Sequence, residues 1–258
     1  MNGRERLLNT LNGRGADRIP VTLFIQSQGH FAKQLDEEYD PWNFEKTQKS
    51  IIDYQRSLGL DVHARMLFFN PYEPVLTVFQ GLNAQTETEC WKVTVEKEED
   101  GYSRRYRQTI HTPEGNLHQT FTVNEIQKGT FMYACTEAPI RTRKDLELAE
   151  KYEPFCSQSV RRKMAEQVKI IKDYVGEDGI VSAWSNGSLF NNISSLIDQT
   201  ELYALFLTDP EFYDRLMSFA KKRVYDYTDI LLEAGVDAIC LSGNAAGGFL
   251  GNPMNRNI

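Results

Sequence analysis

The sequence predicts a parallel α/β fold with an antiparallel meander inserted into it, and two observations lead to this prediction. Segments of helical periodicity alternate with short apolar runs, which is the pattern of parallel βα units. Residues 88–125 instead alternate apolar and polar side chains around an Asp100-Gly101 turn, a strong hairpin signal. The chain has 258 residues, enough for one large domain. We therefore expect a single, partial barrel domain over 1–258 that contains the meander at 88–125.

The helices are predicted from the spacing of apolar residues and from residues typical of helix ends. Thr142 and Asp145 resemble a capping box, and Pro210 suits a first helical position. Glycines follow several of these segments, as they commonly follow helices. Helices are expected over residues 4–12, 43–58, from 142 onward, 157–174 and 210–234.

Five apolar runs are predicted to be parallel strands, at 20–25, 62–68, 129–134, 180–184 and 236–241. The first begins with Pro20, at a position where no ladder donor is needed. A (β/α)₈ barrel needs eight strands, so the chain reaches about the fifth and the barrel is C-terminally incomplete. Open strand edges promote aggregation. Either the sequence is a fragment of a longer protein, or partners, such as further copies in an oligomer, cover these edges.

Composition narrows the class of protein. The chain is 41% hydrophobic and 25% charged, an ordinary globular composition. A net charge of −7 argues against nucleic acid and anionic membranes as partners. The sequence shows no secretory signal and no apolar run of membrane-spanning length, and its four cysteines lack CxxC spacing, which fits reduced thiols. We expect a cytoplasmic protein that acts on small molecules.

Candidate site residues follow the ends of predicted strands, where ligands of parallel α/β proteins bind. The loop after 20–25 is rich in polar side chains, although a plain polar connection is an equally weighted alternative. His63 and Arg65 are two residues apart in one strand, so they project from the same face; an outer ion pair is the alternative for Arg65. We expect His63 and Arg65 to be catalytic, and Gln26, Gln28, His30, Asn186 and Asn244 to bind substrate.

Several motifs are absent or have a structural explanation. The sequence contains no phosphate-binding glycine loop, and its four histidines and four cysteines show no metal-ligand spacing. Cys240 lies on an apolar strand, which predicts a core residue. Arg104, Arg105 and Arg107 of the meander could hold an anion, but such a cluster is more often the solvated side of a sheet. No metal site is therefore expected in this chain.

Residues 4–13, followed by Asp17-Arg18-Ile19-Pro20-Val21, resemble the opening of the uroporphyrinogen decarboxylase superfamily. The similarity continues at 59–61, at the Thr112-Pro113-Glu114-Gly115 turn, at 140–146 and at 233–239. That superfamily adopts a (β/α)₈ barrel and also contains corrinoid-dependent methyltransferases. The resemblance therefore implies this barrel.

The departures from the family pattern concern the substrate site. True decarboxylases carry R-Q-A-G-R-Y after the first strand, with two arginines that bind substrate carboxylates, whereas residues 26–31 here contain neither. Their aspartate after the second strand is also missing, and the nearest position here is Phe68. Neutral side chains cannot replace bidentate guanidinium pairing. The T-P-x-G turn resembles the methyltransferase and O-demethylase branch instead.

The resemblance implies a methyltransferase-like enzyme that moves a methyl group between a small donor or acceptor and a corrinoid. The cobalamin would be carried by a partner protein. Zinc is expected for the full-length family, through an H-x-C pair and a later cysteine beyond the last strand of this chain, so these ligands cannot be carried over. The alternatives are a decarboxylase-like lyase acting on a tetrapyrrole, and a non-catalytic module that binds a corrinoid or tetrapyrrole.

Overall fold

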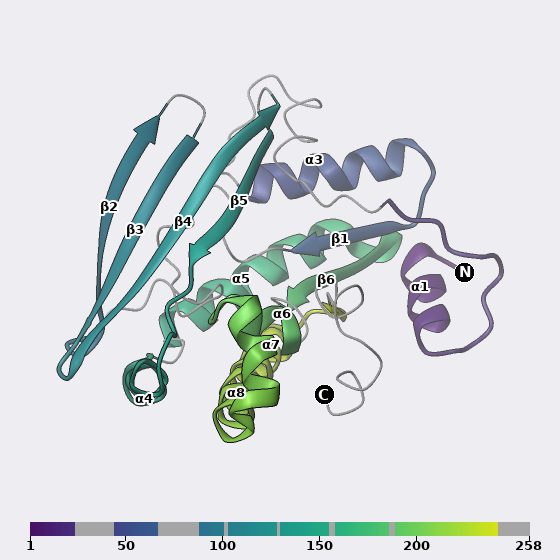
Figure 1. Cartoon of the computed structure of the whole chain (residues 1–258). Helices are drawn as coiled ribbons and strands as arrows, with labels where there is room; N and C mark the ends of the chain where they lie inside the picture. Colours follow the sequence, from purple (N-terminus) through teal and green to yellow (C-terminus); the bar gives the residue numbers. More distant parts are fainter. Residues whose placement is uncertain are drawn as a thin grey trace. The chain divides into compact units, whose positions relative to one another are not determined.

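The computed structural model describes residues 1–23, 44–66, 88–100, 103–127, 130–154, 158–185 and 189–241. Figure 1 labels most of its elements. The chain divides into two compact units: the first comprises Met1–Leu67, Arg161–Trp184 and Ile230–Cys240, and the second comprises Phe68–Val160, Ser185–Asp229 and Leu241–Ile258. Both combine helices with a sheet, which confirms the mixed α/β class. The single barrel domain over 1–258 stays a prediction.

The first unit contains a three-stranded sheet in the order β1-β6-β7. β1 and β6 are parallel, with Val62 opposite Gly179 and Met66 opposite Ala183. Its elements are α1 (Gly3–Leu11), α3 (Phe44–Ser57), β1 (Val62–Met66), α5 (Gln158–Val175), the 3₁₀ turn η3 (Gly176–Asp178), β6 (Gly179–Ser185) and β7 (Ala238–Leu241). Three predicted strands, at 62–68, 180–184 and 236–241, and the helices predicted at 4–12, 43–58 and 157–174 are thereby confirmed.

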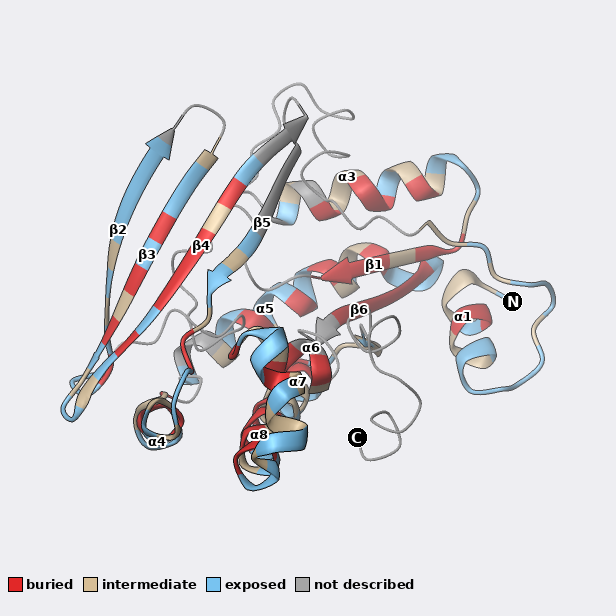
Figure 2. Cartoon of the chain, in the orientation of Figure 1, coloured by how far each residue is buried: buried red, intermediate tan, exposed pale blue. Residues whose placement is uncertain are grey.

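The apolar core of the first unit follows from the two periodicities of its elements. Alternate residues of β1, namely Val62, Ala64 and Met66, are fully buried. On α5 the buried side chains recur at helical spacing, which gives that helix one apolar face. They are Met164, Val168, Ile171 and Val175. Figure 2 shows β1 and the described part of β6 almost wholly buried.

The second unit contains a four-stranded antiparallel sheet in the order β2-β3-β4-β5. Its elements are β2 (Lys92–Asp100), β3 (Ser103–Thr112), β4 (Gly115–Gln127), β5 (Thr130–Glu137), α4 (Arg143–Tyr152), α6 (Leu189–Ser194), α7 (Gln199–Thr208) and α8 (Pro210–Glu233). Ile110 and Leu117 of the sheet share a core cluster with Leu146 of α4, Phe190 of α6 and Leu216 of α8. The meander and the helices predicted from 142 and at 210–234 are confirmed.

The three arginines of the meander are solvated. Arg105 and Arg107 are both exposed and both form ion pairs with Glu98 on the neighbouring strand. Arg104 is likewise exposed and paired with Glu99. This arrangement supports the solvated-sheet explanation of the arginine cluster over an anion site.

Two predicted strands need correction. Residues 130–137 do form a strand, but β5 runs antiparallel to β4 and extends the meander instead of forming a parallel βα unit. Residues 20–23, the described part of the strand predicted at 20–25, are not in a strand, and Val21 is 50% exposed. The Val21 N–H donates to the Asp61 carboxylate at 3.1 Å, and the Val21 carbonyl accepts from the Asp61 N–H. Both backbone groups of Val21 are therefore hydrogen-bonded without a neighbouring strand.

Two helices, α6 and α7, were not predicted. α7 begins at an N-cap, Asp198, whose side chain accepts hydrogen bonds from the N–H groups of Thr200 and Glu201. Its sequence contains a nearly continuous apolar run, Leu202 to Leu207, so that periodicity gives no clear helical signal.

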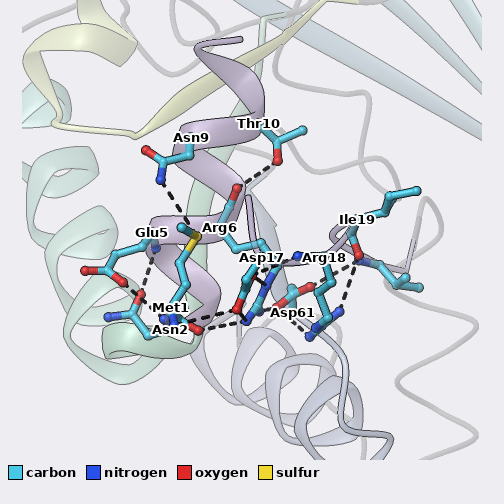
Figure 3. A network of polar contacts seen from close by, with 11 residues as sticks. Met1, Asn2, Glu5, Arg6, Asn9, Thr10, Asp17, Arg18, Ile19 and Asp61 are labelled. Carbon is cyan, nitrogen blue, oxygen red and sulfur yellow. Dashed lines mark hydrogen bonds and ion pairs between the residues drawn. The ribbon is translucent and has the colours of Figure 1, made fainter. Parts of the chain in front are cut away.

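A network of ion pairs holds the N-terminal segment against the start of β1 (Figure 3). Arg6 of α1 donates to Asp17 at 2.7 Å and also to Asp61. Asp61, which precedes β1 and is 2% exposed, also accepts from Arg18 at 3.0 Å. The Arg6 guanidinium holds the pKa of Asp17 well below its usual range, chiefly through its hydrogen bond to that carboxylate. The network therefore fixes where β1 begins.

No helix in the described part of the chain is long and apolar enough to cross a membrane. The two sheets seen among the described residues do not close on themselves, so the (β/α)₈ barrel stays a prediction.

Candidate functional site

Four polar side chains share one face of the sheet in the first unit, and we call this the polar face. His63 and Arg65 alternate with the buried apolar residues of β1. Arg65 lies opposite Ser182 of β6 in register, and directly opposed residues of neighbouring strands project to the same side. Cys240 of β7 reaches the same serine. A buried sheet face that carries several polar groups is costly unless those groups have partners, so their contacts are informative.

Ser182 links the three strands of the polar face through its side chain. Its Oγ lies 2.7 Å from Nε2 of His63, and the Cys240 thiol donates to the same Oγ at 3.3 Å. Ser182 is fully buried, whereas His63 and Cys240 are half-buried. An imidazole, a hydroxyl and a thiol are thus joined in one hydrogen-bonded chain across the sheet.

The backbone under His63 and Arg65 is held by two glutamines of α3. The Gln55 amide accepts from the His63 N–H at 3.1 Å and donates to the His63 carbonyl at 3.4 Å. The Gln48 amide donates to the Arg65 carbonyl at 3.1 Å. Both glutamines are fully buried and lie seven residues apart, on the helix face that also buries Ile51 and Ile52. α3 therefore fixes the position of β1 as well as covering it.

The electrostatic environment keeps His63 neutral. Burial, and in addition the positive charge of Arg65, lower its pKa to about 4. At neutral pH the imidazole therefore carries one N–H donor and one acceptor nitrogen. The imidazole can donate a hydrogen bond to the Ser182 hydroxyl or accept one from it, but it does not form an ion pair.

Asp237 positions β7 next to β6. Its carboxylate accepts two hydrogen bonds from Arg4, at 2.8 and 2.6 Å, one from Lys172 at 2.8 Å and one from the Val181 N–H at 2.9 Å. Burial would raise the pKa of Asp237, but these donors outweigh it and lower the pKa to about 2. Since β7 begins at the next residue, Ala238, this anchor brings Cys240 within reach of Ser182.

The sequence analysis anticipated this face only in part. β1 does place His63 and Arg65 on one face, while their catalytic role stays a prediction. The five residues expected to bind substrate lie outside the described residues: Gln26, Gln28, His30, Asn186 and Asn244. Ser182 was overlooked, although a lone hydroxyl in the apolar run 179–184 was an available signal. Cys240 was expected in the core, but it is half-buried and its thiol is hydrogen-bonded.

The described residues do not fit a zinc site. Within these ranges no group of three or more His, Cys, Asp or Glu side chains could hold a metal ion, and a catalytic zinc needs three protein ligands. On the polar face only His63 and Cys240 are of a ligand type common for zinc. The expectation that this chain binds no zinc stays a prediction, and no step is assigned to a metal.

The chain is similar to one protein family and to one solved structure. The family model described as "Uroporphyrinogen decarboxylase (URO-D)" matches residues 126–257, which include β6 and β7. A solved structure of a methyltransferase from Methanosarcina mazei superposes with a TM-score of 0.62 at 14% sequence identity. That likeness covers 100% of this chain but 63% of the other, so the chain spans under two thirds of the length of this structural neighbour. No curated protein sequence matches.

Proposed function

The chain belongs to the uroporphyrinogen decarboxylase family, and we propose that it is a methyltransferase-like enzyme of this family. It would move a methyl group between a small molecule and a corrinoid carried by a partner protein. The fold likeness to a methyltransferase supports the proposal, as does the loss of the paired arginines that decarboxylases use to bind their substrate.

The observation that carries the proposal is the composition of the polar face. A thiol, a hydroxyl and a neutral imidazole are linked there by hydrogen bonds, with a guanidinium on the same side of the sheet. These groups can bind and orient a small polar molecule and can stabilise negative charge that develops on it. A cobalamin, when bound, supplies the cobalt that carries the methyl group.

In the proposed reaction, His63 holds the Ser182 hydroxyl in place, and Arg65 supplies positive charge beside the reacting molecule. Both are proposed as catalytic residues. Substrate contacts are assigned to the polar residues that follow the strands, namely Gln26, Gln28, His30, Asn186 and Asn244.

The second candidate, a lyase acting on a carboxylated tetrapyrrole, is favoured by one observation. Arg65 is a buried cation on the polar face, and a guanidinium can bind a carboxylate in bidentate fashion. One such residue does not replace the two arginines and the aspartate of true decarboxylases, because uroporphyrinogen carries eight carboxylates. We therefore expect no decarboxylation of uroporphyrinogen at enzymatic rates.

The test compares two reactions on the same protein. Methylcobalamin is mixed with 2-mercaptoethanol as methyl acceptor, and demethylation is followed by absorbance. Uroporphyrinogen is assayed in parallel for coproporphyrinogen. The proposal expects protein-dependent demethylation that falls about tenfold or more in Arg65→Met and is unchanged in His118→Asn, a change on the exposed face of the meander.

The other outcomes each overturn the proposal in a distinct way. Formation of coproporphyrinogen without demethylation would identify the lyase. Binding of methylcobalamin without turnover of either substrate would identify the non-catalytic module. Equal loss of activity in Arg65→Met and His118→Asn would show that the polar face is not the site.

A further inference from the structure

We propose that Gln55 and Gln48 of α3 are positioning residues for the reaction. Their side-chain amides take the place of a neighbouring strand on the open edge of β1, and in this way they fix the backbone that carries His63 and Arg65. The two roles rest on the proposed function, because that function assigns the catalytic parts to His63 and Arg65. The occupation of the strand edge by the two glutamines is independent of it.

β1 is the outer strand of its sheet, in the order β1-β6-β7, so one of its edges has no strand beside it among the described residues. Such an edge leaves backbone N–H and C=O groups without ladder partners, and these groups need other partners when they are buried. Asp61, His63 and Arg65 alternate along this stretch, and each has a backbone group that bonds outside the sheet. The edge is therefore closed by something other than a strand.

Gln55 bonds the backbone of His63 as the peptide groups of an adjacent strand would. Its Oε1 accepts from the His63 N–H at 3.1 Å, and its Nε2 donates to the His63 carbonyl at 3.4 Å. The same Nε2 donates at 3.5 Å to the carbonyl of Ile51, one turn earlier in α3. Both polar atoms of this fully buried amide are thus used, and they hold one residue of β1 on both sides of its Cα.

Backbone makes the preceding contact on the same edge, and Gln48 makes the following one. The Asp61 N–H donates to the Val21 carbonyl at 3.0 Å, and the Gln48 Nε2 donates to the Arg65 carbonyl at 3.1 Å. Within the part of the chain that the structure describes, the buried Oε1 of Gln48 has no hydrogen-bond partner. An apolar side chain would avoid the cost of that unpaired atom, so the bond to Arg65 is what glutamine contributes here.

The two glutamines act on the polar face through the backbone of β1. The His63 imidazole lies 2.7 Å from Ser182 Oγ, a distance that a small displacement of β1 would lengthen. A misplacement of about 1 Å can lower the rate of an enzyme by up to about a hundredfold, even when the substituted residue lies far from the chemistry. Gln55 is therefore expected to act through His63, and Gln48 through Arg65.

The first measurement follows the His63 imidazole by NMR in the whole chain, with its signals assigned by their loss in His63→Gln. Gln55→Met removes both bonds to His63 and keeps an unbranched side chain of similar length. We expect the pKa of His63 to rise from about 4 toward its ordinary value of about 6.5, because the imidazole leaves its buried position. Gln48→Met, the same substitution on the same helix, should change this pKa far less.

A purely structural role of the glutamines predicts a different result. General loosening of the sheet would raise the pKa of His63 equally in Gln55→Met and Gln48→Met, and this outcome overturns the proposal. An unchanged pKa of His63 in Gln55→Met overturns it as well.

The second measurement is the demethylation of methylcobalamin with 2-mercaptoethanol. Each of Gln55→Met and Gln48→Met should lower kcat about tenfold or more while leaving KM nearly unchanged, because the lost effect concerns the reacting groups and not substrate binding. An unchanged kcat in both variants of an active protein overturns the positioning roles. Absence of demethylation in the unmodified protein counts against the proposed function alone, and the pKa of His63 then decides whether Gln55 positions that residue.

A measurement on the unmodified protein keeps the proposal testable if a variant fails to fold. The backbone N–H of His63 and the side-chain N–H of Gln55 are both buried and bonded to each other's residue, so both should exchange with D₂O at least about a hundredfold more slowly than in an unfolded peptide. Exchange of either group at the unfolded rate would show that Gln55 does not hold this edge.

Discussion

His63 shows how one residue can report on the folded state through its protonation. It lies on a strand whose other residues, Arg65 included, are buried, and its imidazole is bonded to Ser182. Burial and Arg65 lower its pKa from 6.5 to about 4. The unfolded chain therefore binds more protons than the folded chain between these two values, and stability must fall as the pH falls through that window.

We predict that the free energy of unfolding decreases between pH 6.5 and pH 4, by up to about 3 kcal/mol from this residue. In His63→Gln the decrease over the same window should be smaller by a similar amount. Urea unfolding at several pH values measures this. Protonation of Asp237, whose pKa is lowered to about 2, reduces the free energy of unfolding only at pH values below this window. An identical pH dependence in His63→Gln would refute the assignment.

Arg223 presents the opposite situation, a charge that stays ionised although it is buried. Its side chain is 8% exposed and donates to Glu153, 6% exposed, at 3.1 Å. It also donates to Asn192 at 2.9 Å. These bonds tie α8 to α6 and to the residue after α4, all within the second unit. Such a pair adds little net stability, but removing one partner leaves a buried charge uncompensated.

Arg223→Leu is therefore expected to destabilise the second unit by about 3–5 kcal/mol. The double change Arg223→Leu with Glu153→Leu should recover most of this loss, because no unpaired charge remains. Lys222→Ala, which removes an exposed ion pair on the same helix, serves as control and should cost about 0.5 kcal/mol or less. Denaturant unfolding compares the three. A double variant as unstable as Arg223→Leu would contradict the explanation.

Among the elements, the contact of β1 with β6 depends on the absence of a side chain. A Cβ added at Gly179 would lie 1.8 Å from the carbonyl oxygen of Val62, its partner in register. Real Cβ atoms never come so close, and the obstacle is backbone, so the strands would have to separate. This is the first residue of β6, and the register that brings Ser182 opposite Arg65 starts from it.

Gly179→Ala is predicted to destabilise the protein by about 2–3 kcal/mol, because the two strands would have to separate. Gly15→Ala is the matched control: nothing lies within 4 Å of its added Cβ, so the change should be within about 0.5 kcal/mol. Thermal unfolding measures both variants. Equal effects of the two substitutions would disprove the close approach.

α4 illustrates an element whose start is determined locally. Thr142 accepts from the Asp145 N–H at 3.2 Å while Asp145 accepts from the Thr142 N–H at 2.8 Å, a reciprocal capping box. The same residues had indicated the helix start in the sequence. Local hydrogen bonds of this kind need no distant partner, so sequence patterns reveal them well.

For the whole molecule, the sequence predicts that the chain binds no zinc. The sequence carries four histidines and four cysteines without metal-ligand spacing, and the family's zinc motif is expected beyond the last strand. We predict that protein purified without added zinc contains much less than one zinc per chain. Elemental analysis by mass spectrometry measures this. One zinc per chain, lost in His63→Gln or Cys240→Ser, would show that the polar face is itself a metal centre.

Sequence patterns sufficed for β1, β6 and β7 and for the helices other than α6 and α7, because an apolar face or a buried run leaves a periodic signal along the chain. They also revealed the meander, since the Asp100-Gly101 turn and the alternating residues are local features. The family could be inferred in the same way, from short motifs such as the one at 4–13, and the URO-D match over 126–257 agrees with it.

The direction of β5, the absence of a strand at 20–23 and the polar face depended on contacts between distant residues. Pairing with β4 makes β5 antiparallel, and the carboxylate of Asp61 takes the N–H of Val21. Cys240 looks like a core residue among its apolar neighbours in sequence. Its thiol reaches Ser182, 58 residues earlier in the chain, only because the strand order is β1-β6-β7. Register and strand order are set by packing between elements, and no single stretch of sequence contains that information.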